Sequence, residues 1–70
     1  MDYYDQLRAW RMTNKLSQKQ VADYLNIDRS TYAYYELGRT RLHVDILVSL
    51  AKLYGVSLDA LIYGKPGVRK

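Results

Sequence analysis

The chain has 70 residues, enough for one compact core, so we expect a single domain and exclude a second one. Hydrophobic residues make up 49% of the chain and charged residues 26%, which excludes a disordered polypeptide. The formal net charge of +4 favours a polyanionic partner, and the absence of cysteine excludes disulfides and thiolate metal sites.

The sequence also argues against membrane insertion and export. It contains no apolar run approaching the roughly 18 residues that a membrane span needs. The N-terminus lacks the succession of basic, apolar and small residues that marks a signal peptide. We therefore expect a cytoplasmic protein without membrane contact.

The first two predicted helices are marked by apolar spacing and by a cap. Tyr4, Leu7 and Trp10 recur three residues apart, which predicts a helix over residues 3–14. The hydroxyl of Ser17 can cap a second helix, and Gln20 can reach back to complete a capping box. The inward-facing residues of this second helix are Val21, Ala22 and Leu25.

A short break separates the second helix from a third. Asn26 tolerates a left-handed backbone and can end a helix within one residue. Asp28 is a good N-cap for a third helix over residues 29–36, which Gly38 closes. The linker that follows, residues 39–43, carries two arginines.

Two further helices complete the chain. The fourth spans residues 44–54 and ends at Gly55, and its core-facing stripe is Leu47, Leu50, Ala51 and Tyr54. Ser57 caps the fifth, and the residues expected to dock it on the core are Leu58, Leu61 and Ile62. No segment alternates with period two, so we predict an all-α bundle of five short helices.

The third helix has two unlike sides at about 100° per residue. Tyr32 and Tyr35 fall together on a side that packs inward. The free side carries a guanidinium, a hydroxyl, a methyl and a phenol, from Arg29, Ser30, Ala33 and Tyr34. Such groups can grip guanine, hydrogen-bond base edges, touch the thymine methyl and reach a phosphate in the major groove of DNA.

The segments Leu16-Ser17-Gln18, Val21-Ala22, Leu25-Asn26-Ile27 and Glu36-Leu37-Gly38 follow one another in a characteristic order. Together with residues 50–61, they resemble the Cro and lambda-repressor-type helix-turn-helix family of XRE-like regulators. The resemblance covers residues 4–64 and implies a lambda-repressor-like DNA-binding domain whose second and third helices form the helix-turn-helix. We assign residues 1–64 to this domain and residues 65–70 to a flexible basic tail.

The resemblance also implies roles for individual residues. The base-reading positions are Arg29, Ser30 and Tyr34, with Ala33 on the same face. The positions expected to contact phosphate are Ser17, Gln18, Arg39, Thr40, Arg41 and His43. Arg11 and Glu36 match a partly buried ion pair that ties the first helix to the end of the third.

The sequence departs from the family pattern at four positions. Asn26 stands where the turn usually has glycine, and Lys15 stands where glycine often ends the first helix. Tyr32 and Tyr35 replace the usual aliphatic core residues. We expect these changes to affect the tilt of the third helix, and so which residues reach the bases.

These observations predict sequence-specific binding of double-stranded DNA by a bacterial or phage transcriptional regulator of the repressor kind. We expect a homodimer on a near-palindromic operator with half-sites about 34 Å apart. The apolar residues left over for the dimer surface are Ile46, Leu53, Ile62 and Tyr63. The alternative is a protein-interaction module such as an antitoxin, which Asp23 and Asp28 near the proposed DNA face would favour.

Catalysis and cofactor binding have no motif in this chain. It has no glycine-rich phosphate loop, nucleophile elbow or zinc-ligand spacing, so we do not expect an enzyme. His43 is the single histidine, which argues against a metal site. No cofactor or small-molecule ligand is expected.

Overall fold

The computed structural model describes residues 4–66, which form five helices and no strand. The helices are α1 (Tyr4–Thr13), α2 (Gln18–Leu25), α3 (Arg29–Leu37), α4 (Val44–Tyr54) and α5 (Leu58–Tyr63). The predicted all-α class and the order of the helices are confirmed, and α3 extends one residue further than predicted. The predicted start of α1 at Tyr3 and most of the predicted tail, residues 67–70, lie outside the described residues.

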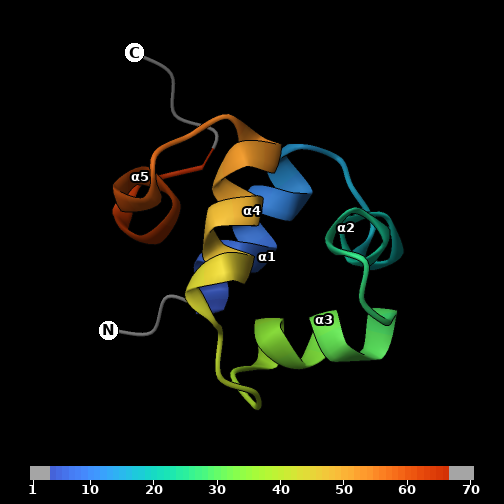
Figure 1. Ribbon diagram of the computed structural model, residues 1–70. Coiled ribbons are helices and arrows are strands. Elements are labelled where there is room, and N and C mark those ends of the chain that lie inside the picture. The colour runs from blue at the N-terminus through green and yellow to red at the C-terminus, as the bar shows by residue number, and fades with distance from the viewer. Residues whose placement is uncertain (1–3, 67–70) are drawn as a thin grey trace.

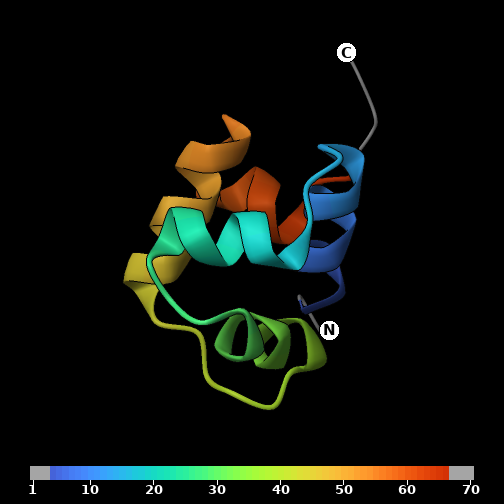
Figure 2. The ribbon, with the colours of Figure 1, turned by 90° about the vertical axis from the view of Figure 1, so that its right-hand side faces the viewer.

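Four helices are arranged around the core, with α1 and α4 on opposite sides and α2 and α5 on the other two sides (Figures 1 and 2). Helix α3 lies across one end of the molecule (Figures 1 and 2). Each helix, and the linker before α4, contributes to the core, whose buried members are Leu7, Val21, Ala22, Tyr32, Tyr35, Leu42, Leu50, Ala51 and Leu61. Helix α3 and the linker before α4 lie at the same end of the molecule (Figure 2).

A residue with left-handed backbone follows each of the first four helices, directly after α2, α3 and α4 and two residues after α1. These residues are Lys15 (φ 58°), Asn26 (φ 61°), Gly38 (φ 72°) and Gly55 (φ 69°). In each case the next amide donates to a carbonyl five residues earlier, as in Leu16 N to Arg11 O at 3.1 Å. Each helix therefore stops within two residues, and the left-handed conformation predicted for Asn26 is confirmed.

The N-cap residues differ in whether their side chains form a capping hydrogen bond. Ser17 and Gln20 form the predicted capping box, with Gln20 N to Ser17 Oγ at 3.0 Å and Ser17 N to Gln20 Oε1 at 2.8 Å. The Ser57 hydroxyl accepts from Ala60 N at 3.0 Å. Asp28 occupies the N-cap position of α3, but its side chain makes no capping hydrogen bond, so that part of the prediction is wrong. The carboxylate is exposed, and water can solvate it at little cost.

Helix α5 is attached to α1 by polar side chains as well as by apolar packing. Gln6 Nε2 donates to Gly64 O at 2.6 Å, and Trp10 Nε1 donates to Leu61 O at 3.0 Å. Leu61 is fully buried, but Leu58 is 40% exposed, so its predicted role in docking α5 is wrong. Leu58 is the first residue of a helix of only 6 residues, and the contacts from α1 reach the other end.

Replacing Lys15 with glycine should stabilise the fold. A left-handed backbone costs a residue with a Cβ atom about 1–2 kcal/mol, and glycine avoids this cost. Glycine loses more conformational entropy on folding, which reduces the gain by about 0.5–1 kcal/mol. Lys15 is exposed, so the change removes no buried contact. We expect the free energy of unfolding, measured in urea, to rise by about 0.5–1 kcal/mol.

Lys15→Ala is the matched control, because it removes the same charge but keeps a Cβ atom. The alanine variant should not raise the free energy of unfolding. If alanine stabilised the protein as much as glycine does, the backbone conformation would not be the cause.

Candidate nucleic-acid interface

Helices α2 and α3 meet across a tight turn made of Asn26, Ile27 and Asp28. Ala22 is fully buried beneath the crossing, where a larger side chain would push the helices apart. The amide of Ile27 donates to the Ala22 carbonyl at 3.0 Å and closes the turn on the same residue. The two helices thus have the arrangement predicted for a helix-turn-helix.

Helix α3 has one buried side and one exposed side. Tyr32 is 0% exposed and Tyr35 is 5% exposed, and their rings meet edge to face. Arg29 and Ser30 are exposed, and Tyr34 is 48% exposed. Ala33 is half-buried, so only part of its methyl group is accessible. The predicted division of the helix is confirmed.

One further residue, not singled out from the sequence, shares the exposed side of α3. Leu37 is 65% exposed at the last position of the helix. It follows Ser30 by seven residues and Tyr34 by three, the spacing of neighbours on one helical face. This spacing is the signal in the sequence that places Leu37 on the exposed side of the helix.

A buried ion pair joins α1 to the end of α3. Arg11 Nε donates to Glu36 Oε2 at 2.6 Å and Arg11 Nη2 to Glu36 Oε1 at 3.2 Å. The two side chains are only 13% and 4% exposed. Arg11 Nη1 also donates to Leu16 O at 3.0 Å, so the guanidinium holds the α1–α2 connection too. The predicted structural pair is present.

Gln18 extends this network to the start of α3. Its Nε2 donates to Glu36 Oε1 at 3.1 Å, and its Oε1 accepts from Arg29 Nη1 at 3.0 Å. The carboxylate can only accept and the guanidinium can only donate, so the amide has one orientation that serves both. Gln18 therefore contacts both ends of α3 and holds the exposed Arg29 side chain.

The hydrogen-bond network shifts the pKa of Glu36. Burial alone would raise the pKa of Glu36, but hydrogen bonds, led by the one from Arg11 and including that from Gln18, outweigh it and lower the pKa below its ordinary value. Within residues 4–66, the buried hydroxyls of Tyr32 and Tyr54 have no hydrogen-bond partner. Burial raises the pKa of Tyr54 to about 12 and also raises that of Tyr32, so both phenols stay neutral.

The linker before α4 is held by one buried side chain. Leu42 is 7% exposed, whereas Arg41 and His43 on either side of it are exposed. Arg39 is also exposed and Thr40 is half-buried. Burial of Leu42 therefore leaves the side chains on either side of it exposed, in a linker at the same end of the molecule as α3 (Figure 2).

The remaining polar residues near this surface have modest roles. The Ser17 hydroxyl already accepts the capping bond, which leaves its proton free to donate outward. Asp23 pairs with Lys19 at 3.1 Å on an exposed face, where such pairs contribute little. The charge of Asp23, which favoured a protein partner, is thus compensated within α2. In residues 4–66 no cluster of three or more His, Cys, Asp or Glu side chains could hold a metal ion.

A profile of the helix-turn-helix family matches residues 7–61. The chain belongs to the helix-turn-helix family. The family and the lambda-repressor-like fold predicted from the residues are therefore confirmed. No solved structure matches the chain. Among the described residues, no helix combines the length and apolar character that a membrane crossing would require.

Curated relatives of the chain are transcriptional regulators. It is 38% identical over 60 residues to the HTH-type transcriptional regulator YobD of Bacillus subtilis, covering 86% of this chain and 54% of YobD. It is 35% identical over 60 residues to the SPbeta prophage-derived HTH-type transcriptional regulator YonR of Bacillus subtilis, covering 86% and 56%. It is 30% identical over 60 residues to the cryptic phage CTXphi transcriptional repressor RstR of Vibrio cholerae, covering 86% and 54%.

The chain spans about half the length of the curated relatives that it matches. The shared part is the helix-turn-helix region.

Replacing Glu36 with glutamine should destabilise the fold in a pH-dependent way. The substitution leaves Arg11 buried without its counter-charge, which should cost about 3 kcal/mol at pH 7. Because folding lowers the pKa of Glu36, its ionised form stabilises the native state above the ordinary value of 4.5. That contribution disappears as the pH falls below 4.5 and through the lower pKa of the folded state.

Urea unfolding of both proteins between about pH 7 and pH 3 checks this expectation. The gap in unfolding free energy between wild type and Glu36→Gln should be widest at neutral pH and close in acid. Asp23→Asn, which breaks an exposed ion pair, is the control and should change stability by less than about 0.5 kcal/mol. A gap that stayed constant over this range would contradict the role of the charge.

Proposed function

We propose that this chain binds double-stranded DNA sequence-specifically by inserting α3 into the major groove. The observation that carries the proposal is the position of Arg29, exposed at the start of α3 and held by Gln18. An arginine at a helix start is disfavoured by the helix dipole, so an anionic or guanine partner supplies a reason for it. A guanidinium held in one orientation suits the paired acceptors on the major-groove edge of guanine.

The neighbouring residues of α3 extend the reading face. The Ser30 hydroxyl can donate or accept, and the phenol of Tyr34 can reach a base or a phosphate. The accessible parts of Ala33 and Leu37 are apolar and suit the methyl group of thymine. Together these residues form a surface that can distinguish base pairs.

Two other segments are proposed to grip the DNA backbone. The first amides of α2 have no partner within the helix and, with Ser17 and Gln18, form a site for phosphate. The linker contributes Arg39, Thr40, Arg41 and His43 from the same end of the molecule. These contacts set the register of α3 without reading sequence.

We further propose a repressor-like transcriptional regulator of bacterial or phage origin that acts as a homodimer on a near-palindromic operator. The names of the relatives support this proposal, because one is a repressor of a cryptic phage and another derives from a prophage. A domain with one short reading helix makes few base contacts, and two-fold pairing doubles them.

Selection of bound duplexes from a random DNA pool tests the proposal. We expect a recovered motif with two inverted half-sites about 10 base pairs apart, centre to centre. An empty selection by folded protein would overturn DNA recognition and favour a protein partner instead.

Arg29 and Arg41 should affect DNA binding in different ways. Arg29→Ala should cost about 1–3 kcal/mol on the selected site and relax the preference at one base pair. Arg41→Ala should weaken all duplexes alike and reduce the slope of log affinity against log salt concentration by about 1.

The measurement is fluorescence anisotropy on a panel of single-base variants at several salt concentrations. Lys52→Ala is the control, since Lys52 is an exposed cation in the last turn of α4, at the end of the molecule away from α3 (Figure 1). Equal losses for both arginine variants on every duplex would show that the two roles are misassigned.

A further inference from the structure

Two phenol hydroxyls lie in the interior of the protein beside the charged network of Glu36. Tyr32 of α3 is fully buried, and the hydroxyl oxygens of Tyr32 and Tyr54 are both shielded from solvent. Among the residues that the structure describes, none forms a hydrogen bond with either hydroxyl. A buried hydroxyl without a partner destabilises a folded protein, and buried polar groups therefore nearly always have one. Both hydroxyls can thus bind a further polar group.

The two hydroxyls and the Glu36 carboxylate face the same part of the core. Tyr32 and Glu36 are four residues apart on α3, the spacing of neighbours on one helical face. Burial raises the pKa of Tyr32 most, and the adjacent Glu36 carboxylate raises it further. Burial also raises the pKa of Tyr54, which the Tyr32 hydroxyl lowers and the Glu36 carboxylate raises. Three polar groups from α3 and α4 therefore converge at one place.

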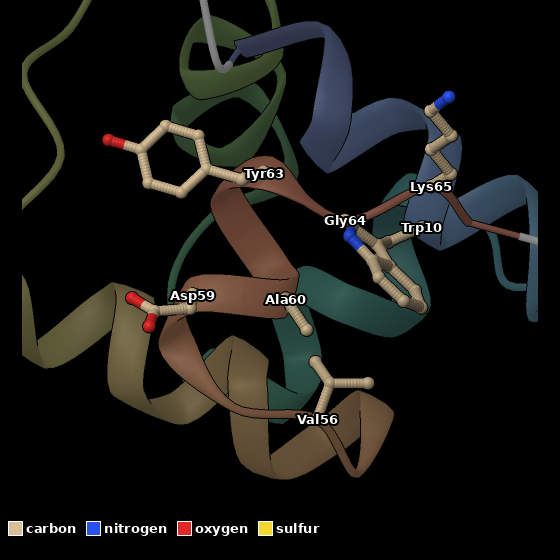
Figure 3. A pocket seen from close by; sticks show the side chains of 7 residues that line it. All are labelled: Trp10, Val56, Asp59, Ala60, Tyr63, Gly64 and Lys65. Carbon is tan, nitrogen blue, oxygen red and sulfur yellow. The ribbon is translucent and has the colours of Figure 1, made fainter.

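This polar site is closed on one side by Trp10. The indole ring stacks on Tyr54 with ring centroids 6.0 Å apart, and its N–H donates to Leu61 O at 3.0 Å. Trp10 also lines a surface groove between α1 and α5, together with Val56 and Ala60 (Figure 3). Tyr54 is not one of the residues that line this groove, so the indole separates Tyr54 from it. Bulk solvent therefore does not reach the two hydroxyls through the groove.

We infer that the hydroxyls of Tyr32 and Tyr54 and the carboxylate of Glu36 bind one buried water molecule. Water matches the site because each hydroxyl can donate or accept, whereas the carboxylate can only accept. The water donates one proton to the carboxylate and one to a hydroxyl, and it accepts the proton of the other hydroxyl. Three hydrogen bonds are the usual number for a buried water in a protein.

Glu36 has the capacity for this additional donor. Its Oε1 accepts from Arg11 Nη2 and from Gln18 Nε2, but its Oε2 accepts only from Arg11 Nε, at 2.6 Å. A carboxylate oxygen can accept two hydrogen bonds, so Oε2 has one acceptor site left. Ions fit this site less well than water, because Glu36 repels an anion and Arg11 already supplies the positive charge.

The water would extend the network of Glu36 to a fourth helix. Direct hydrogen bonds join α1, α2 and α3 at this carboxylate. Through the water, Tyr54 at the end of α4 is attached to the same group. The inference concerns the interior of the protein and does not depend on DNA binding.

Removal of single hydroxyl groups tests this inference by urea unfolding. Tyr32→Phe and Tyr54→Phe each remove one oxygen atom and keep the aromatic ring. If both hydroxyls bind the water, each variant should lower the equilibrium constant for folding about threefold to tenfold. A hydroxyl without a partner would give the opposite sign, because its removal takes an unsatisfied polar group out of the core.

The double variant and a control separate a shared water from general effects of phenylalanine. Because both hydroxyls contact the same molecule, the second replacement should cost at least about twofold less than it does alone. Tyr35→Phe is the control. Tyr35 is 5% exposed and packs edge to face against Tyr32, but its hydroxyl is not one of the buried unpartnered groups within residues 4–66. Its replacement should change the folding constant by less than about twofold.

A crystal structure of the wild-type chain identifies the bound molecule. An ordered water within about 3.0 Å of both hydroxyl oxygens, absent from the Tyr32→Phe/Tyr54→Phe variant, is the expected result. A direct hydrogen bond between the two hydroxyls, or between Tyr32 and Glu36, without such a water would overturn the inference. Stabilisation by either single replacement, or independent effects of the two, would overturn it as well.

Discussion

The buried carboxylate of Glu36 is the point at which three helices are fixed to one another. It accepts hydrogen bonds from Arg11 of α1 and Gln18 of α2, while it belongs to α3 itself. An ionised group that is only 4% exposed would cost several kcal/mol if unpaired, so arrangements that break these bonds are strongly disfavoured. The angle between α2 and α3 therefore follows from satisfying one charge.

The same network connects the interior of the protein with its proposed reading face. The side-chain amide of Gln18 donates a hydrogen bond to the buried carboxylate of Glu36 and accepts one from the exposed guanidinium of Arg29. A disturbance at Glu36 can thus reach Arg29 through one side chain. Helix α3 has only 9 residues, too few to be stable alone in water, and depends on packing through Tyr32 and Tyr35.

The proposed DNA-binding surface occupies one end of the molecule (Figures 1 and 2). The end formed by α3 and the linker presents cations and hydrogen-bonding groups, as recognition of a polyanion requires. Helices α2 and α5 lie on opposite sides of the core, and α3 lies at one end of the molecule (Figures 1 and 2).

Features that depend on neighbours in the sequence were predictable from the sequence. The Ser17 capping box, the left-handed Asn26 and the two sides of α3 arise from spacings of one to four residues, which local backbone geometry decides. Resemblance to a known family supplied the Arg11–Glu36 pair. Only the tertiary structure decided that Gln18 bridges both ends of α3, that Leu58 stays exposed and that Ile46 packs inward. These outcomes depend on where distant segments meet, and no local spacing encodes that.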